Sequence, residues 1–345
     1  MDIDTNDVLF EWRSLDHISP HDSVVPLGHR PREGFTSFDA WDYFHANSVD
    51  KDAQGDYLVS GRHTSSIYKI NGQTGDIIWT LGGKKSNFTF ANGTEFAFQH
   101  DARFQGKQGA IEHVSLFDNG AGSNGHQGDE KGRIREFSSG KVFRLNTSDW
   151  TATLVKQVVH PDRVLAPSQG NTQMLPNGNV FVNWGQAGAI TEFRADDGTP
   201  VFSAYLDSWD SGAGVQNYRG FRFEWAGRSP EVPAIVALGG GERVSVYVSW
   251  NGDTETVAWR FFRTRNGRVE VLGEVERTGF ETSFKIDKAD VEAGDGAKFF
   301  AEAVGRRGKV LGRTGVVGLT VDVGSFGDED RKVAGPLGQA VFDGQ

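Results

Sequence analysis

Short apolar runs separated by polar turns follow one another through the first two thirds of the chain, and one series of them occurs twice. The first copy has its runs at 57–60, 67–70 and 75–79. The second copy has the corresponding runs at 180–183, 190–193 and 198–202. The register is kept without a gap, because Ile67 and Ile190 are 123 positions apart and so are the flanking glycines. A repeated unit of three or four short strands is typical of a β-propeller blade, which buries its faces only against neighbouring blades.

The chain between the two copies is long enough for one more blade, since half of the repeat distance is about 61 residues. Period-two alternation predicts its strands at 114–117, 139–145 and 151–158. The pattern therefore predicts three blades, at 43–82, 98–159 and 168–206. Two further apolar runs, at 8–12 and 221–225, are predicted as outer strands that flank these blades.

Three blades are too few for a closed ring, because closed propellers have about four to eight. An open stack would leave strand edges and apolar faces in water. We therefore expect an incomplete β-propeller over residues 1–228, with the blades that precede Met1 missing from this chain.

The residue composition of the chain changes after Trp225. Gly, Ser and Pro residues predict a linker at 229–233, and about ninety residues of short strands follow it at 234–323. The Trp residues in its early strands and the Phe299-Phe300 pair in a late one resemble an immunoglobulin or fibronectin type III β-sandwich, with the Trp side chains in the core. Residues 324–345 are predicted to be a flexible tail. The whole chain is thus predicted to be all-β.

The composition of the chain argues against some classes of binding partner. A formal net charge of −10 argues against a nucleic-acid partner, and no apolar stretch approaches the roughly 20 residues of a membrane helix. The absence of cysteine leaves the redox compartment open. Three Asn-x-Ser/Thr glycosylation motifs favour a secreted protein, and their acceptors are Asn87, Asn92 and Asn146.

Candidate chemistry lies where each blade's innermost strand begins, at the mouth of the central channel. The segments at these places are 43–50, 98–103 and 168–173, which contain His45, Asn47, His100 and Gln169. Two histidines at matched positions of different blades would direct two imidazoles at one axis, where they could bind a metal, transfer protons or attack an electrophile. Arg62 follows a strand of the first blade and could bind an oxyanion, although an ion pair between blades explains it equally well. Asn119 closes a strand of the second blade, where a turn residue is also expected.

The order of these motifs resembles the arylsulfotransferase (ASST) family, and within it the group found in filamentous fungi and some bacteria. The motifs are FHANSVD at 44–50, GRH at 61–63, IIWTLGG at 77–83, QHDAR at 99–103, FDN at 117–119 and LPNGN at 175–179. The resemblance covers about residues 7–226 and does not include the predicted sandwich.

The resemblance implies a secreted or periplasmic propeller, six-bladed in characterised members, that moves a sulfuryl group from an aryl sulfate to a phenol. The transfer runs through a sulfated histidine and uses no nucleotide cofactor. By position, His45 and His100 match channel histidines of the family, and Arg62 and Asn119 match oxyanion contacts, with Asn47 and Gln169 as further substrate-binding candidates.

One motif departs from the family pattern. The bacterial enzymes use a third channel histidine as nucleophile, whereas this chain reads SQGN at 168–171. Other histidines nearby in sequence are His113, His126 and His160; His126 lies in a Gly-rich loop and His160 precedes a proline, so neither begins an inner strand. Two other hypotheses therefore stand beside the transferase: a lyase or hydrolase with His45 and His100 as ligands of zinc or calcium, and a non-catalytic secreted binding module.

Overall fold

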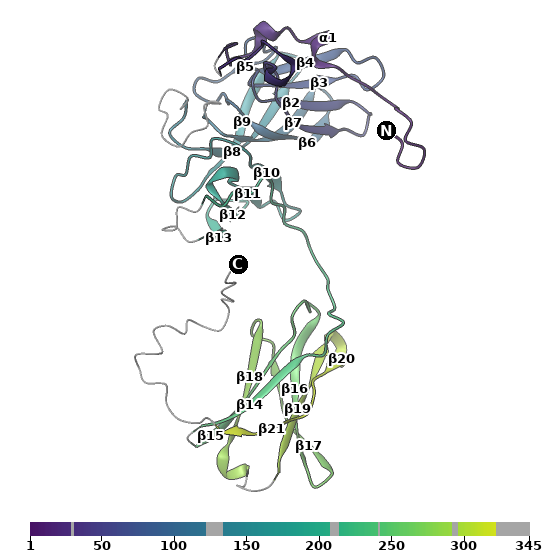
Figure 1. Cartoon of the computed structure of the whole chain (residues 1–345), viewed down its shortest axis with the longest axis vertical. Helices are drawn as coiled ribbons and strands as arrows, with labels where there is room; N and C mark the ends of the chain where they lie inside the picture. The colour runs from purple at the N-terminus through teal and green to yellow at the C-terminus, as the bar shows by residue number, and fades with distance from the viewer. Residues whose placement is uncertain (29–30, 122–133, 208–213, 241, 292–295, 322–345) are drawn as a thin grey trace. The chain divides into compact units, whose positions relative to one another are not determined.

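The computed structural model describes the chain apart from a few segments, which are 29–30, 122–133, 208–213, 241, 292–295 and 322–345. The protein is nearly all-β (Figure 1). Its contacts divide it into two compact units, Met1–Arg222 and Phe223–Gln345. The predicted domain bounds at 228 and 234 stay predictions, and the predicted tail at 324–345 lies outside the described residues. Among the described helices, none has the length and apolar character needed to cross a bilayer.

The first and third sheets of the first unit are the two copies of the repeat, as predicted. Their strands are β1 (Ala46–Lys51), β2 (Tyr57–Gly61), β3 (Ser66–Ile70) and β4 (Ile77–Gly82), and β10 (Asn171–Met174), β11 (Val180–Asn183), β12 (Ala189–Phe193) and β13 (Pro200–Tyr205). In each sheet the strands pair antiparallel in chain order, which is the order expected of a propeller blade. The matched spacing in the sequence is therefore matched strand register in the structure.

The second sheet lies between them in sequence and confirms the three strands predicted from alternation. Its order is β5-β9-β8-β7-β6, with β5 (Thr89–Phe90), β6 (His100–Gln108), β7 (Ile111–Asp118), β8 (Ser139–Asn146) and β9 (Thr151–Val159). The short β5 joins the outer edge by pairing parallel to β9. The number of blades in a complete ring stays a prediction.

Apolar side chains hold the three sheets together in chain order. One buried cluster joins the first sheet to the second, through residues such as Leu58 and Leu116, and another joins the second to the third, through Phe117 and Val182. Because both faces of the middle sheet are covered, its central strands read as nearly continuous buried runs. The same burial is seen along β3 of the first sheet.

Residues 8–12 do not form a strand, so that prediction is wrong. Their aromatic side chains instead pack on one face of the first sheet: the Phe10 ring stacks on Tyr57 with 4.8 Å between centroids, and Trp12 Nε1 donates to the Gly75 carbonyl over 3.1 Å. The apolar residues of this segment therefore serve side-chain packing, and its backbone does not pair with a strand. This region also holds three short helices, α1 (Ser14–His17), η1 (Pro20–Asp22) and η2 (Ser37–Asp39).

Residues 221–225 are not an outer strand either. The segment that begins at Gly220 follows β10 in the way that β6 follows β1, because side chains of the earlier strand accept hydrogen bonds from backbone N–H groups of the later one. The four bonds are Asp101 N to Asn47 Oδ1 (3.2 Å), Phe104 N to Asp50 Oδ2 (2.9 Å), Gly220 N to Asn171 Oδ1 (2.8 Å) and Arg222 N to Gln173 Oε1 (2.8 Å). The segment thus takes the place of the next inner strand.

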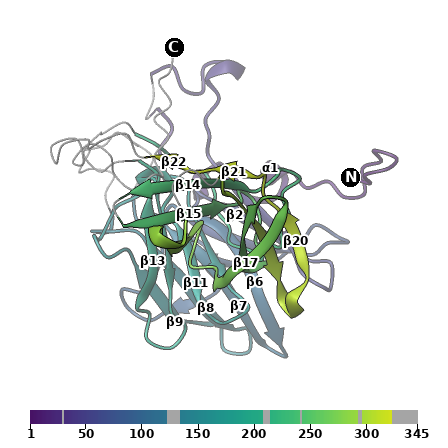
Figure 2. The same ribbon diagram turned by 90° about the horizontal axis from the view of Figure 1, so that it is seen from below.

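The second unit consists of two sheets over one core. One has the order β18-β15-β14-β22 and the other β17-β16-β19-β20, with β21 paired to β19. The bounds are β14 (Ala234–Gly240), β15 (Arg243–Ser249), β16 (Thr256–Arg265), β17 (Arg268–Glu276), β18 (Glu281–Asp287), β19 (Lys298–Gly305), β20 (Val310–Arg313), β21 (Val317–Gly318) and β22 (Thr320–Val321). Figure 2 shows β14 and β15 side by side.

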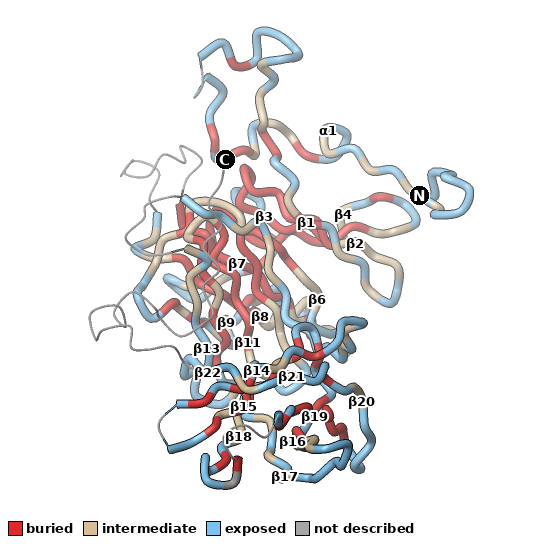
Figure 3. The backbone as a smooth tube through the Cα atoms, turned by 60° about the horizontal axis from the view of Figure 1, so that its bottom comes forward, coloured by how far each residue is buried: buried red, intermediate tan, exposed pale blue. Residues whose placement is uncertain are grey.

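Residues from both sheets of the second unit form a single buried cluster, as in a β-sandwich. Trp250 and Trp259 belong to it and are almost fully buried, so both are core residues as predicted. Figure 3 shows buried stretches along β16 and β19, whereas the residues of β20 are exposed or half-buried. The immunoglobulin or fibronectin type III assignment of this unit stays a prediction.

Candidate active site

A residue with left-handed backbone precedes the inner strand of each of the three sheets. These residues are His45 (φ 51°), Phe98 (φ 54°) and Gln169 (φ 65°). Counted from this common turn, His45 is the turn residue itself, whereas His100 lies two positions later, where the first sheet has Asn47. The two histidines therefore do not occupy matched positions, because the turn that sets the count falls on His45 in the first sheet and two residues before His100 in the second.

His100 is the first residue of β6, and its ring is held by a network that fixes its tautomer. Asn119 Nδ2 donates to the carbonyl oxygens of Ala166 (2.8 Å) and Gln169 (2.9 Å), so its Oδ1 is the acceptor that faces His100 Nδ1 at 2.7 Å. His100 Nδ1 must therefore carry the hydrogen, and the lone pair lies on Nε2. The backbone N–H of Gln169 donates to that Nε2 over a long 3.3 Å.

The surroundings of His100 keep its ring neutral. Burial lowers its pKa to about 3, although the hydrogen bond to Asn119 opposes this shift. The charges of Arg62, His45 and Arg219 lower the pKa further. A neutral imidazole with its lone pair on Nε2 is the form that attacks an electrophile, and a low pKa keeps this form populated over the whole physiological range.

Arg62 lies just beyond the end of β2 and is buried, with only 5% of its surface exposed. Its Nη2 donates to the Pro167 carbonyl over 2.8 Å, its Nη1 lies 3.0 Å from His63 Nε2, and its guanidinium stands 5.1 Å from the centre of the Phe98 ring. Burial lowers its pKa to about 10, so it stays charged at neutral pH. Its Nε is buried and has no hydrogen-bond partner among the described residues.

His63 is a second buried imidazole that the sequence analysis did not select as a site residue. Because Arg62 donates to its Nε2, its hydrogen lies on Nδ1, which donates to the Asp42 carbonyl over 2.5 Å. Burial lowers its pKa to about 4, and the hydrogen bond to Asp42 opposes that shift. The signal in the sequence was its place in the GRH motif beside Arg62.

Asp42, also missed by the sequence analysis, joins His45 and His63 in one cluster. The Asp42 carboxylate accepts a short hydrogen bond from His45 Nδ1, and the two imidazole rings lie 4.5 Å apart. His45 is exposed, unlike His63 and His100. An Asp–His pair with the second ring nitrogen turned away from the carboxylate is an arrangement suited to general acid–base catalysis.

One ligand atom from each of Asp42, His45 and His63 lies within 4.8 Å of the others, a set that suits zinc or iron by residue type. His100 is not a member of this group. The group also fits a cation poorly, because both nitrogens of His63 already have partners and one partner is the positive Arg62.

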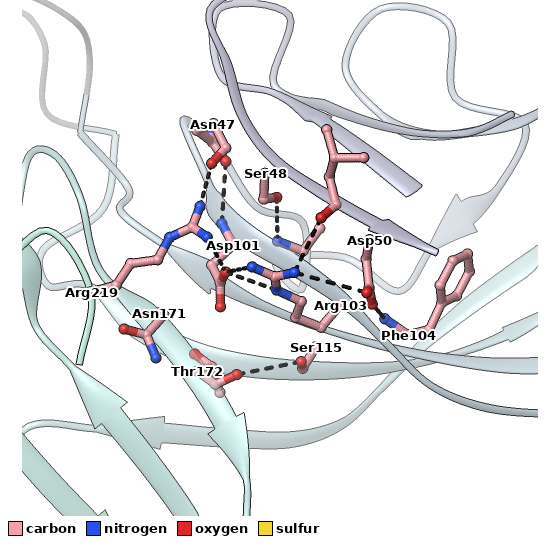
Figure 4. Close-up of polar contacts among 12 residues, drawn as sticks. Asn47, Ser48, Asp50, Asp101, Arg103, Phe104, Ser115, Asn171, Thr172 and Arg219 are labelled. Atoms are coloured by element: carbon pink, nitrogen blue, oxygen red, sulfur yellow. Dashed lines mark hydrogen bonds and ion pairs between the residues drawn. The ribbon is translucent and has the colours of Figure 1, made fainter. Parts of the chain in front are cut away.

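The amide side chains of Asn47 and Gln169, both candidates for substrate binding, form hydrogen bonds to other segments of the chain. Asn47 Oδ1 accepts from the backbone N–H of Asp101 (Figure 4). Its Nδ2 donates to the Gln99 carbonyl over 2.8 Å, so both ends of the amide bind neighbouring backbone. Gln169 Nε2 donates to Gln216 Oε1 over 2.8 Å, and its own Oε1 is buried without a hydrogen-bond partner among the described residues. Asn47 is therefore a structural residue, and Gln169 retains one polar atom for a ligand.

The remaining histidines near these motifs lie elsewhere. His113 is half-buried in β7, and His126 lies outside the described residues. His160 is buried against the rings of Trp184 and Tyr205, each 5.3 Å away between centroids. Of the glycosylation candidates, Asn87 and Asn92 are exposed and Asn146 is half-buried.

The first unit is thus a nearly all-β assembly of several sheets, with two buried imidazoles whose pKa is lowered, a partly exposed Asp–His pair and a buried guanidinium. A family model, described as Arylsulfotransferase (ASST), matches residues 1–205. The chain belongs to the arylsulfotransferase family, as the resemblance in the sequence indicated.

Comparison with curated proteins finds no match. Among solved structures, a protein of unknown function from Bacteroides caccae is 13% identical, with 80% of this chain and 71% of that chain covered and a TM-score of 0.26. Virginiamycin B lyase from Staphylococcus aureus is also 13% identical, with 79% and 70% covered and a TM-score of 0.29. Likenesses with such low TM-scores carry no weight for function.

Proposed function

We propose that the protein transfers a sulfuryl group from an aryl sulfate to a phenol, with His100 as the nucleophile. The observation that carries this proposal is the fixed amide of Asn119, which leaves the lone pair of a neutral His100 on Nε2. Membership of the arylsulfotransferase family supports the reaction class. No nucleotide cofactor is needed, because the donor already carries the activated sulfuryl group.

The reaction divides into two steps. In the first, the lone pair of His100 Nε2 attacks sulfur, the N–S bond forms, and the bond from sulfur to the aryl oxygen breaks. In the second, the hydroxyl oxygen of the acceptor phenol attacks sulfur and the N–S bond breaks, which regenerates the imidazole. The buried positive charge of Arg62 favours the anionic group during both steps.

The Asp42–His45 pair is proposed as the general acid and base. Asp42 holds the hydrogen on His45 Nδ1, so Nε2 is the nitrogen that exchanges protons. A protonated His45 gives its proton to the departing phenolate in the first step, and neutral His45 takes the proton of the acceptor hydroxyl in the second. The two imidazoles thereby have separate roles, which their different burial supports.

The test uses the intact chain with 4-nitrophenyl sulfate as donor and phenol as acceptor, without nucleotide. We expect a burst of 4-nitrophenol stoichiometric with protein in the absence of acceptor, and sulfated His100 in the peptide map. His100→Ala should abolish the burst, His45→Ala should slow it, and the exposed His21→Ala should leave it unchanged. A wild-type protein without a burst, or one whose activity disappears with EDTA, would refute the proposal.

We further propose that the three sheets are blades of a propeller, six-bladed as in the family, and that the second unit is an immunoglobulin or fibronectin III-like sandwich. Three glycosylation motifs support a secreted protein. Expression in a eukaryotic secretory host, with a mass decrease on removal of N-linked glycans, tests this location. Secretion without any such decrease would remove the glycoprotein assignment.

A further inference from the structure

Residues 216–222, which follow the family-matched part of the chain, bind the third sheet of the first unit near Gln169. The Tyr218 carbonyl accepts from Gly170 N over 3.1 Å, and the Asn217 carbonyl accepts from Asn183 Nδ2 over 2.9 Å. Gln216 accepts from Gln169, as described above. These bonds, together with those from Gly220 and Arg222 to β10, fix the backbone on both sides of Arg219.

Arg219 points from this segment to the starts of the first two inner strands. Its Nη2 donates to the Asn47 carbonyl, and its Nη1 lies 3.1 Å from Asp101 Oδ1. Figure 4 shows the guanidinium between these two residues. Asp101 directly follows His100 in the chain and is almost fully buried, so the contact ties Arg219 to the nucleophile's own strand.

The positive charge of Arg219 is only partly neutralised. Asp101 Oδ1 also accepts from Arg103, through Nε at 2.9 Å and Nη2 at 2.7 Å, so one carboxylate oxygen serves two guanidinium groups. Arg219 Nε is buried and has no hydrogen-bond partner among the described residues. Arg62 likewise has a buried Nε without a hydrogen-bond partner among the described residues. Its other side-chain nitrogens contact the Pro167 carbonyl and the neutral His63 ring.

Both guanidinium groups act on His100, since the charge of each lowers its pKa. A neutral nucleophile whose strand is contacted by one guanidinium and whose pKa is lowered by two, each with a buried and unpartnered Nε, suits the binding of a sulfate anion. We propose that Arg219 is an anion-binding residue of the His100 site and that, with Arg62, it holds the sulfate group of the donor. This inference rests on the proposed function for its substrate, and it adds a binding residue from outside the family-matched region.

The chain offers a matched control on the same segment. Arg222 is three residues further on; it donates to the Glu192 carboxylate and lies over the Phe202 ring at 5.8 Å, so its contacts are with β12 and β13 of the third sheet. Its backbone N–H, which joins the segment to β10, is kept when the side chain is replaced. Arg219→Gln and Arg222→Gln therefore each remove one positive charge, but only the first removes it from the site.

The experiment is calorimetric titration of the intact chain with inorganic sulfate. We expect wild-type binding, a Kd raised about tenfold or more in Arg219→Gln, because a charge-assisted hydrogen bond is lost, and a Kd within about twofold of wild type in Arg222→Gln. Unchanged sulfate binding in Arg219→Gln, or no binding by wild type, overturns the proposal. Should Arg219→Gln fail to fold, Arg219→Lys must still raise the Kd by about threefold or more, because lysine keeps the charge and loses the planar fork.

Donor kinetics separate this inference from the proposed function. If sulfate binding depends on Arg219 but wild type transfers no sulfuryl group, the anion site stands and the transferase falls. If transfer occurs while Arg219→Gln leaves both the sulfate Kd and the KM for 4-nitrophenyl sulfate unchanged, the transferase stands and the role of Arg219 falls. A rise in KM larger than the fall in kcat supports a residue that holds the donor.

Discussion

Burial of neutral His100 makes the stability of the first unit depend on pH, and this dependence gives a direct test of its environment. The pKa of His100 is about 3 in the folded protein, against 6.5 for an unperturbed histidine. Below pH 6.5 the unfolded chain therefore binds a proton that the folded chain refuses, so stability is complete above the unfolded pKa and is lost as pH falls toward 3.

The magnitude follows from the size of the pKa gap. Each pH unit in that window costs about 1.4 kcal/mol per such histidine, so lowering the pH from 7 to 5 costs about 2 kcal/mol through His100 alone. His63, whose pKa is lowered to about 4, acts in the same direction. The window ends near pH 3, where the folded ring also takes up its proton.

The assay is urea unfolding at pH 7 and pH 5, followed by tryptophan fluorescence. His100→Gln should lose stability at pH 7, because the ring contacts are gone, but its pH 7 to pH 5 difference should be smaller than that of wild type by about 2 kcal/mol. The exposed His21→Gln serves as control and should keep the wild-type difference. An equal difference in His100→Gln and wild type would show that His100 is not held neutral, and the assignment of the nucleophile would lose its basis.

Two further predictions concern the buried polar contacts. Asn119→Ala removes the acceptor of His100 and two carbonyl contacts; it should destabilise the first unit by about 2 kcal/mol in urea unfolding and reduce sulfuryl transfer, and full activity would contradict the fixed tautomer. Lys69→Met removes the buried partner of Glu112 between the first two sheets; it should cost about 3 kcal/mol in the same assay, whereas Lys156→Met, at the edge of the second sheet, should cost less.

Strand periodicity in the sequence was enough to predict most of the first unit. The runs in both copies of the repeat and in the sheet between them became strands, because their apolar side chains must be covered and the stacked sheets cover them. Residues 8–12 show where the pattern fails. Apolar side chains alone do not make a strand unless the backbone also pairs with a neighbour, and here Phe10 and Trp12 pack on one face of the first sheet instead.

The sequence by itself determined the repeat, the all-β class, the family and the identity of His45, Arg62, His100 and Asn119 as polar residues at strand ends, because these depend on local periodicity and on motifs along the chain. Tertiary structure alone decided which of them act together. It assigned the lone pair of His100 through the orientation of Asn119, joined Asp42 and His63 to His45, used Asn47 as a link between sheets, and delivered Arg219 from a segment over a hundred positions away. Such pairings are fixed by strand register and hydrogen-bond geometry between sheets, which no local pattern records.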